Sequence, residues 1–200
     1  MATVHIAGVL PRIGTTTLAL QLVRFVQDCG YTACYVEMSR QEYIWGVTNI
    51  YEGVTKERQT GKTTYAGISL YGSDRLRALL DGKLGDYDYI IADFGSIKDP
   101  AYDISVFGGG DCGILVCGNK PNEIFASEDA LAESMYVDCI TVFNFTDPAD
   151  RPAIREMMAD RGDTTEFLPY IPDPFHAGKE LVVQDFFQRL MDLVVRNLEA

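Results

Sequence analysis

The feature that most constrains the fold of this chain is an alternation of short apolar runs with segments of helical periodicity. The runs are apolar along nearly their whole length, which is typical of strands covered on both faces. They span residues 3–7, 32–38, 87–95, 112–118 and 139–145. Alternation of such strands with helices predicts an α/β fold with a doubly wound, mostly parallel sheet flanked by helices. No repeat or low-complexity segment interrupts the pattern, so we expect a single domain over residues 1–200.

The segments between these runs have their own signatures. Residues 16–30 carry apolar side chains at helical spacing and stop at Gly30, which predicts a helix. Residues 55–72 have β-prone pieces on both sides of a turn and predict a hairpin, whereas residues 39–53 predict only a weak helix or a loop. The closing segment, residues 178–200, has a helical apolar stripe and few basic residues, so we expect it to pack on the sheet rather than on a membrane.

Composition excludes several classes of function. The formal net charge is −12, so the surface repels phosphate backbones and we expect no direct binding of nucleic acid. No apolar run reaches the roughly 18 residues of a membrane span. The N-terminal segment has no basic leader followed by a long apolar stretch, which favours a cytoplasmic location. The five cysteines form no Cys-x-x-Cys pair, and we interpret them as reduced, buried, small apolar residues.

The stretch LPRIGTTT, residues 10–17, joins the first strand to the first helix. In a parallel sheet this turn lies at the carboxyl ends of the strands, where a helix N-terminus offers unpaired N–H groups and a positive dipole end. Gly14 permits close approach of a phosphate, and Thr16 takes the place of the Mg²⁺-binding hydroxyl in G-x-x-x-x-G-K-[ST]. Thr15 replaces the lysine and Val9 the first glycine. The alternative is a strand-to-helix turn rich in capping threonines.

Taken in order, the motifs resemble those of the ParA/MinD group of P-loop NTPases, in the SIMIBI class, over nearly the whole chain. The loop pattern of that group is K-G-G-x-G-K-T-T; Gly14, Thr16 and Thr17 match it, and Leu10 and Thr15 replace its lysines. The resemblance implies a P-loop NTPase-like fold with a degenerate Walker A loop. The loop is most similar to that of the TadZ/CpaE pilus-assembly proteins. The resemblance to those proteins covers their NTPase domain only.

Further motifs support the same resemblance. The second strand ends in YVEMSRQ, which places Glu37 and Ser39 at the two aspartates of the group's D-x-D-P-Q motif. YDYIIADFG places Asp93 at the Walker B-like acid. The resemblance also implies three residues that bind near the base of the nucleotide, Asn144, Pro172 and Asp173.

These assignments imply ATP or ADP and Mg²⁺ as cofactors. The resemblance implies that Thr16 and Asp93 hold the metal, since Mg²⁺ prefers oxygen ligands and keeps several waters, and that Glu37 and Asp93 are the catalytic acids. For both carboxylates the alternative is a helix or turn cap. Ser39 removes a second acid, so we expect weak hydrolysis or none.

The phosphates are assigned to the loop. Its candidate binding residues are Arg12, Ile13, Gly14, Thr15, Thr16 and Thr17. Loss of the lysine removes a charge-assisted contact worth roughly 1.5–3 kcal/mol. Arg12 would compensate, because its planar guanidinium suits phosphate oxygens; the alternative is a solvated loop arginine.

Three functions follow, in order of preference. The first is a nucleotide-binding ParA/MinD-type protein with weak or absent hydrolysis, acting as a switch or as a localisation or assembly factor, with a homodimer or another protein as partner. The second is a nucleotide-free scaffold or interaction module that kept the fold. The third is a ligase of the dethiobiotin-synthetase type, which normally needs the lysine-bearing loop that this chain lacks.

Overall fold

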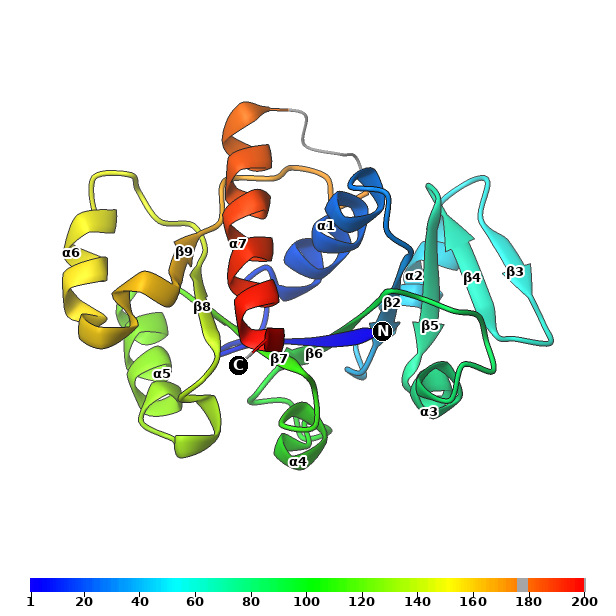
Figure 1. The fold of residues 1–200 in the computed structure, drawn as a ribbon, viewed down its shortest axis with the longest axis horizontal. Coiled ribbons are helices and arrows are strands. Elements are labelled where there is room, and N and C mark those ends of the chain that lie inside the picture. Colours follow the sequence, from blue (N-terminus) through cyan, green and yellow to red (C-terminus); the bar gives the residue numbers. More distant parts are fainter. Residues whose placement is uncertain (176–179, 200) are drawn as a thin grey trace.

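The computed structural model describes residues 1–175 and 180–199, and these residues form one nine-stranded sheet (Figure 1). In spatial order its strands are β3 (Thr55–Glu57), β4 (Lys62–Tyr65), β5 (Ile68–Gly72), β2 (Ala33–Glu37), β6 (Tyr89–Ser96), β1 (Ala2–Gly8), β7 (Cys112–Cys117), β8 (Ile140–Phe143) and β9 (Thr165–Phe167). All neighbours from β5 to β9 run parallel, and β3, β4 and β5 are antiparallel. The predicted mostly parallel α/β sheet is therefore confirmed.

Helices cover both faces of the sheet. They are α1 (Thr15–Asp28), α2 (Tyr43–Ile50), α3 (Leu76–Leu80), α4 (Ile104–Phe107), α5 (Pro121–Leu131), α6 (Arg151–Met157) and α7 (Leu181–Glu199), with short 3-10 helices η1 (Ser73–Arg75), η2 (Ser134–Tyr136) and η3 (Ala159–Thr164). Figure 1 shows α1 and α7 on one side of the sheet and α3, α4 and α5 on the other. This arrangement is the doubly wound pattern that the sequence predicts.

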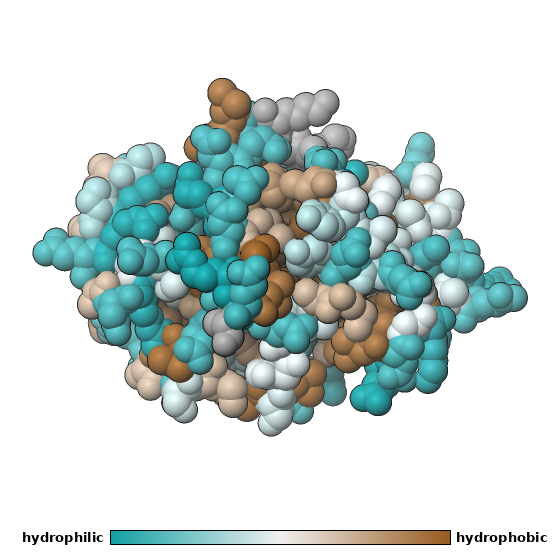
Figure 2. All heavy atoms as spheres, viewed as in Figure 1, coloured by the Kyte–Doolittle hydropathy of each residue, from teal (hydrophilic) through white to brown (hydrophobic). Residues whose placement is uncertain are grey.

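Helix α7 packs on the sheet as predicted. The buried members of its apolar stripe include Phe186, Phe187 and Leu190, and the ring of Phe187 stacks on Phe25 of α1 at 5.7 Å between centroids. Hydrophilic residues gather on its outward side (Figure 2). The start and the last residue of the predicted segment, residues 178, 179 and 200, lie outside the described residues. Within the described chain, no helix has the length and apolar character to span a bilayer.

Two local predictions need correction, and a third is decided between its alternatives. Residues 55–72 form three strands instead of one hairpin, because a second turn, with positive φ at Ala66 and Gly67, reverses the chain before β5. For residues 39–53 the sequence left a weak helix or a loop open, and residues 43–50 form a helix. Cys29 is exposed, since it lies just past the end of α1, whereas the other four cysteines are buried as predicted.

Candidate functional site

The loop of residues 9–14 connects β1 to α1 and folds back over Gly8. A Cβ atom on Gly8 would lie 2.5 Å from Cγ2 of Ile13 and 2.5 Å from Oγ1 of Thr15, so only glycine fits beneath the loop. Arg12 and Gly14 both have left-handed backbones, with φ of 62° and 98°. An arginine in this region carries backbone strain, which is often stored at functional sites.

Helix α1 begins at Thr15 without a side-chain cap on Gly14. The first N–H groups of a helix have no partner within it, and together with the helix dipole they suit an anion. A hollow of about 290 Å³ opens beside this helix start, with Arg12 as its one charged lining residue among those described. Its lining residues are Arg12, Gly14, Thr15, Thr16, Thr17, Gln41, Tyr43, Gly95 and Phe145. The structure thus gathers five of the six predicted loop residues around one cavity.

The sixth predicted loop residue, Ile13, points away from this cavity. Its side chain is buried, packed over Gly8, and its carbonyl oxygen accepts a hydrogen bond of 2.9 Å from Nδ2 of Asn144. Asn144 also accepts from the N–H of Phe145 at 2.8 Å. A Cβ atom on Gly14 would come within 2.1 Å of the same Nδ2. Asn144, directly after β8, therefore holds the loop in place through its side-chain amide.

Asp93 on β6 is fully buried and receives three hydrogen bonds. Oδ2 accepts from the hydroxyl of Thr16 at 2.6 Å and from that of Tyr35 at 2.8 Å, and Oδ1 accepts from the N–H of Gly95 at 2.9 Å. Burial raises the pKa of this carboxyl, and the three donors oppose that rise. The predicted metal pair, Thr16 and Asp93, is thus in direct contact.

Glu37 ends β2 in register with Asp93 on the neighbouring strand. Its two carboxylate oxygens accept from the N–H groups of Tyr43 and Ile44, at 2.6 and 3.0 Å, so it caps the start of α2. Burial raises the pKa of Glu37, and the two backbone donors lower it in part. The structure therefore gives Glu37 the cap that the sequence left as an alternative, and its catalytic role stays a prediction.

Pro172 and Asp173 do not line the cavity. Pro172 is exposed, and the side chain of Asp173 accepts from the N–H of Phe175 at 2.8 Å. Gln21 of α1 donates to the backbone oxygens of Asp173 and Pro174, at 3.3 and 2.8 Å. This segment is thus fixed to the helix that follows the loop.

Sequence reasoning gave no site role to five residues of the site, and one of them had a signal. The five are Tyr35, Gln41, Tyr43, Gly95 and Phe145. Tyr35 lies in an apolar strand, and a buried tyrosine hydroxyl normally needs a hydrogen-bond partner. Gln41 and Tyr43 belong to a segment without strong periodicity. Phe145 is 51% exposed, and the ammonium of Lys120 lies 5.8 Å from the centre of its ring; nothing in its sequence context marks it as part of a site.

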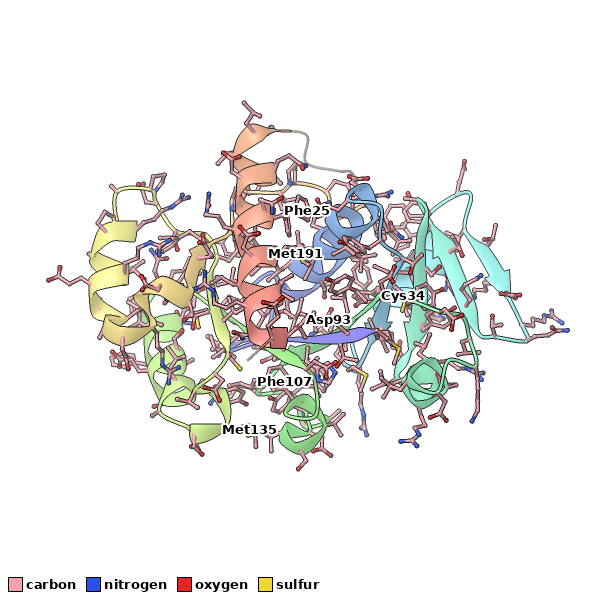
Figure 3. All side chains as sticks on the ribbon, viewed as in Figure 1. Phe25, Cys34, Asp93, Phe107, Met135 and Met191 are labelled. Atoms are coloured by element: carbon pink, nitrogen blue, oxygen red, sulfur yellow. The ribbon has the colours of Figure 1, made fainter. Side chains whose placement is uncertain are left out.

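A larger hollow, of about 860 Å³, lies at the amino ends of β7, β8 and β9. It is lined by residues that include Phe107, Asp111, Met135, Asp138 and Arg161. Figure 3 shows Phe107, the last residue of α4, and Met135 next to that helix, whereas Asp93 lies at the sheet.

Comparison with solved structures agrees with this architecture. MinD cell division protein of Aquifex aeolicus matches with a TM-score of 0.65 and 16% identity, over 100% of this chain and 98% of that chain. A ParA family ATPase of Chlorobium tepidum matches with 0.61 and 15%, over 100% and 99%. A putative plasmid partition protein of Borrelia burgdorferi, bound to AMPPNP, matches with 0.63 and 10%, over 98% of both chains.

No model of a protein family and no curated protein matches the sequence. At identities this low the structural matches establish the fold, and they confirm the predicted ParA/MinD-like P-loop NTPase architecture.

Proposed function

We propose that this chain is a nucleotide-binding P-loop protein of the ParA/MinD type, with a preference for ATP and weak or absent hydrolysis. It acts as a nucleotide-gated switch or as a localisation or assembly factor. The observation that carries the proposal is the uncapped start of α1, which opens on a hollow lined by threonines and one arginine. A protein of the same fold has been solved with AMPPNP bound.

The phosphates bind at the loop. The N–H groups of residues 14–17 supply donors and the dipole of α1 supplies positive potential. Arg12 supplies the cation that Thr15 lacks: it is exposed and lines the hollow, and no acidic side chain among the described residues forms an ion pair with it. Because its guanidinium is uncommitted, it is available for a phosphate oxygen.

The residues around Thr16 offer oxygen ligands to a magnesium ion that would arrive with the nucleotide. The hydroxyl of Thr16 donates a hydrogen bond to Asp93 and keeps its oxygen lone pairs. The two side chains thus offer the oxygen ligands that Mg²⁺ prefers. No group of three His, Cys, Asp or Glu side chains suited to a metal occurs among the described residues. Thr16 and Asp93 are therefore the proposed protein ligands beside phosphate oxygens, whose charge the ion would neutralise, but the hydrogen bonds that Asp93 already accepts from protein groups limit its share.

Hydrolysis is slow in this proposal for two reasons. Thr15 cannot stabilise charge that develops on a transferred phosphoryl group. Glu37 and Asp93, the proposed catalytic acids, both have their oxygens engaged with protein donors. A carboxylate engaged in this way is a poor base for an attacking water.

A homodimer or another protein is the proposed partner. One solved ParA with the same fold is bound to nonspecific DNA, but the net charge of −12 in this chain disfavours contact with a phosphate backbone. We therefore propose no direct binding of nucleic acid.

The second candidate is the nucleotide-free scaffold. It is favoured by the same engaged carboxylates, because Glu37 and Asp93 are satisfied by protein groups alone. In that case the hollow beside α1 is a structural remnant.

Equilibrium binding of ATP, ADP and GTP, measured by calorimetry with Mg²⁺ and with EDTA, separates the two candidates. We expect binding at submillimolar concentration and, in a sensitive phosphate-release assay, little turnover. If no nucleotide binds at millimolar concentration, the scaffold function stands.

A further inference from the structure

Tyr35 makes a contact that ties β2 to the candidate site. Its side chain is fully buried, and its hydroxyl donates to Oδ2 of Asp93 at 2.8 Å. The hydroxyl of Thr16 donates to the same oxygen at 2.6 Å. Two protein donors therefore converge on the oxygen of Asp93 that faces Thr16.

This arrangement limits what Asp93 offers a metal. A carboxylate has about four lone-pair positions; Tyr35 and Thr16 occupy both on Oδ2, and the N–H of Gly95 occupies one on Oδ1. Mg²⁺ keeps waters that donate to neighbouring acids. Such a water would have to displace a donor from Oδ2 or use the one position left on Oδ1.

Displacement of Tyr35 is unfavourable. Asp93 is the acceptor of its hydroxyl, and the surroundings are closed to solvent because both side chains are fully buried. A buried hydroxyl that loses its acceptor keeps the full cost of its desolvation. Glu37 is a poor substitute ligand, because each of its oxygens already accepts from a backbone N–H at the start of α2 and a shift of the side chain would release both bonds.

We propose that Tyr35 is a positioning residue that makes nucleotide binding at this site nearly independent of Mg²⁺. It does so by holding the Asp93 carboxylate in hydrogen bonds with the protein. The inference rests on the proposed nucleotide function, and it states how strongly nucleotide binding at that site depends on Mg²⁺.

The test compares ATP affinity in excess Mg²⁺ with ATP affinity in excess EDTA. For the wild type we expect the two to differ by less than about twofold. Tyr35→Phe keeps the ring and frees a position on Oδ2, so we expect Mg²⁺ to raise its affinity by roughly fivefold or more. A ratio of affinities is used because a purely structural role of Tyr35 would weaken both values alike.

Tyr71→Phe is the matched control. Tyr71 is also fully buried, on the adjacent strand β5, and its hydroxyl lies 3.1 Å from that of Tyr87, away from Asp93. Its removal should leave the Mg²⁺ ratio at the wild-type value. The melting temperature of each variant without nucleotide shows whether it folds.

The outcomes are separable. Wild-type affinity that rises more than about tenfold with Mg²⁺ overturns the inference, even where Tyr35→Phe does not fold. Equal ratios in the wild type and Tyr35→Phe overturn it while the proposed function stands. Absence of ATP binding in both proteins overturns the proposed function and the inference with it.

Discussion

The two ends of the parallel strands each carry a hollow, and they differ in size and in chemistry. The hollow at the amino ends measures about 860 Å³ and the one at the carboxyl ends about 290 Å³. In a sheet of this type the helices that follow the strands begin at the carboxyl ends, so unpaired N–H groups and positive dipole ends collect there. The uncapped start of α1 is an instance. Volume alone would therefore select the end opposite to the proposed site.

The acidic residues at the two ends of the strands differ in their exposure to solvent. Asp111, Asp138 and Asp160 line the larger hollow and are exposed. Glu37 and Asp93, at the carboxyl ends, are buried. A buried carboxylate must be held by donors, and here the donors come from the elements that shape the cavity. The acids that line the larger hollow are thus solvated, whereas the two beside the smaller hollow are held by protein donors at the end of the sheet where we propose the site.

The largest effect is expected from Gly14→Ala. The left-handed backbone of Gly14 costs an alanine about 1–2 kcal/mol, and the new Cβ would collide with Nδ2 of Asn144. The loop must then move, so we expect lower stability and a loss of more than about tenfold in ATP affinity. Chemical denaturation and calorimetry measure the two effects.

Gly30→Ala is the control for that substitution. Gly30 has a similar φ of 90° with open space around its Cβ position, and it lies past the end of α1. It should lose stability from the backbone alone and keep its ATP affinity. If Gly14→Ala behaves like Gly30→Ala in both measurements, the loop does not position phosphate.

The next effect is that of Arg12→Ala. Loss of a charge-assisted hydrogen bond worth roughly 1.5–3 kcal/mol should weaken ATP binding about tenfold or more. Calorimetry is compared with Arg58→Ala, an exposed arginine in the turn between β3 and β4, and with Asp138→Asn at the other end of the sheet. Both controls should bind ATP as the wild type does. Unchanged affinity in Arg12→Ala would show a solvated loop arginine.

Much of the fold was predictable because its strongest signals are long. Apolar strands that alternate with helices leave few arrangements other than a doubly wound sheet. The errors fell where a local signal was short. The turn at Ala66 and Gly67 lies inside a run of β-prone residues, and Cys29 lies one position beyond α1, where the apolar stripe no longer decides which side is buried.

The site was predictable in part for a similar reason. Thr16 and Asp93 each follow from their place at the carboxyl edge, and they are in contact. Tyr35 was hidden in a strand where tyrosine also serves as a core residue. Glu37 could be a cap or a catalytic acid, and only the position of α2, which has a weak pattern, shows that both of its oxygens are engaged.

A smaller effect, of opposite sign, is expected from Thr15→Lys. This substitution restores the lysine of the loop motif at a residue that lines the hollow. The new cation should raise ATP affinity by up to about tenfold and increase phosphate release modestly. Thr17→Lys adds the same charge to the same helix turn, two positions away, and should gain less. Equal gains in both variants would indicate general electrostatic attraction rather than a phosphate position beside residue 15.

The smallest effects concern pH, and they should have opposite signs at the two ends of the sheet. His5 on β1 is buried against Phe107 and Gly110, near the larger hollow, and its Nδ1 donates to the oxygen of Phe107 at 2.8 Å. Burial lowers the pKa of His5 below its usual 6.5. The stability that it contributes is therefore present above that value and lost as the pH falls through it.

Glu37 at the carboxyl ends should respond in the opposite direction. Burial raises its pKa above the usual 4.5, so its contribution to stability is complete below that value and declines as the pH rises through the raised pKa. The free energy of unfolding is measured between about pH 4 and 8 for the wild type, His5→Gln and Glu37→Gln. The advantage of the wild type over His5→Gln should shrink on acidification below neutral pH, and its advantage over Glu37→Gln should shrink as the pH rises above the ordinary carboxyl range. Parallel curves for all three proteins would mean that neither group titrates differently on folding, and that the contrast between the two ends is one of shape alone.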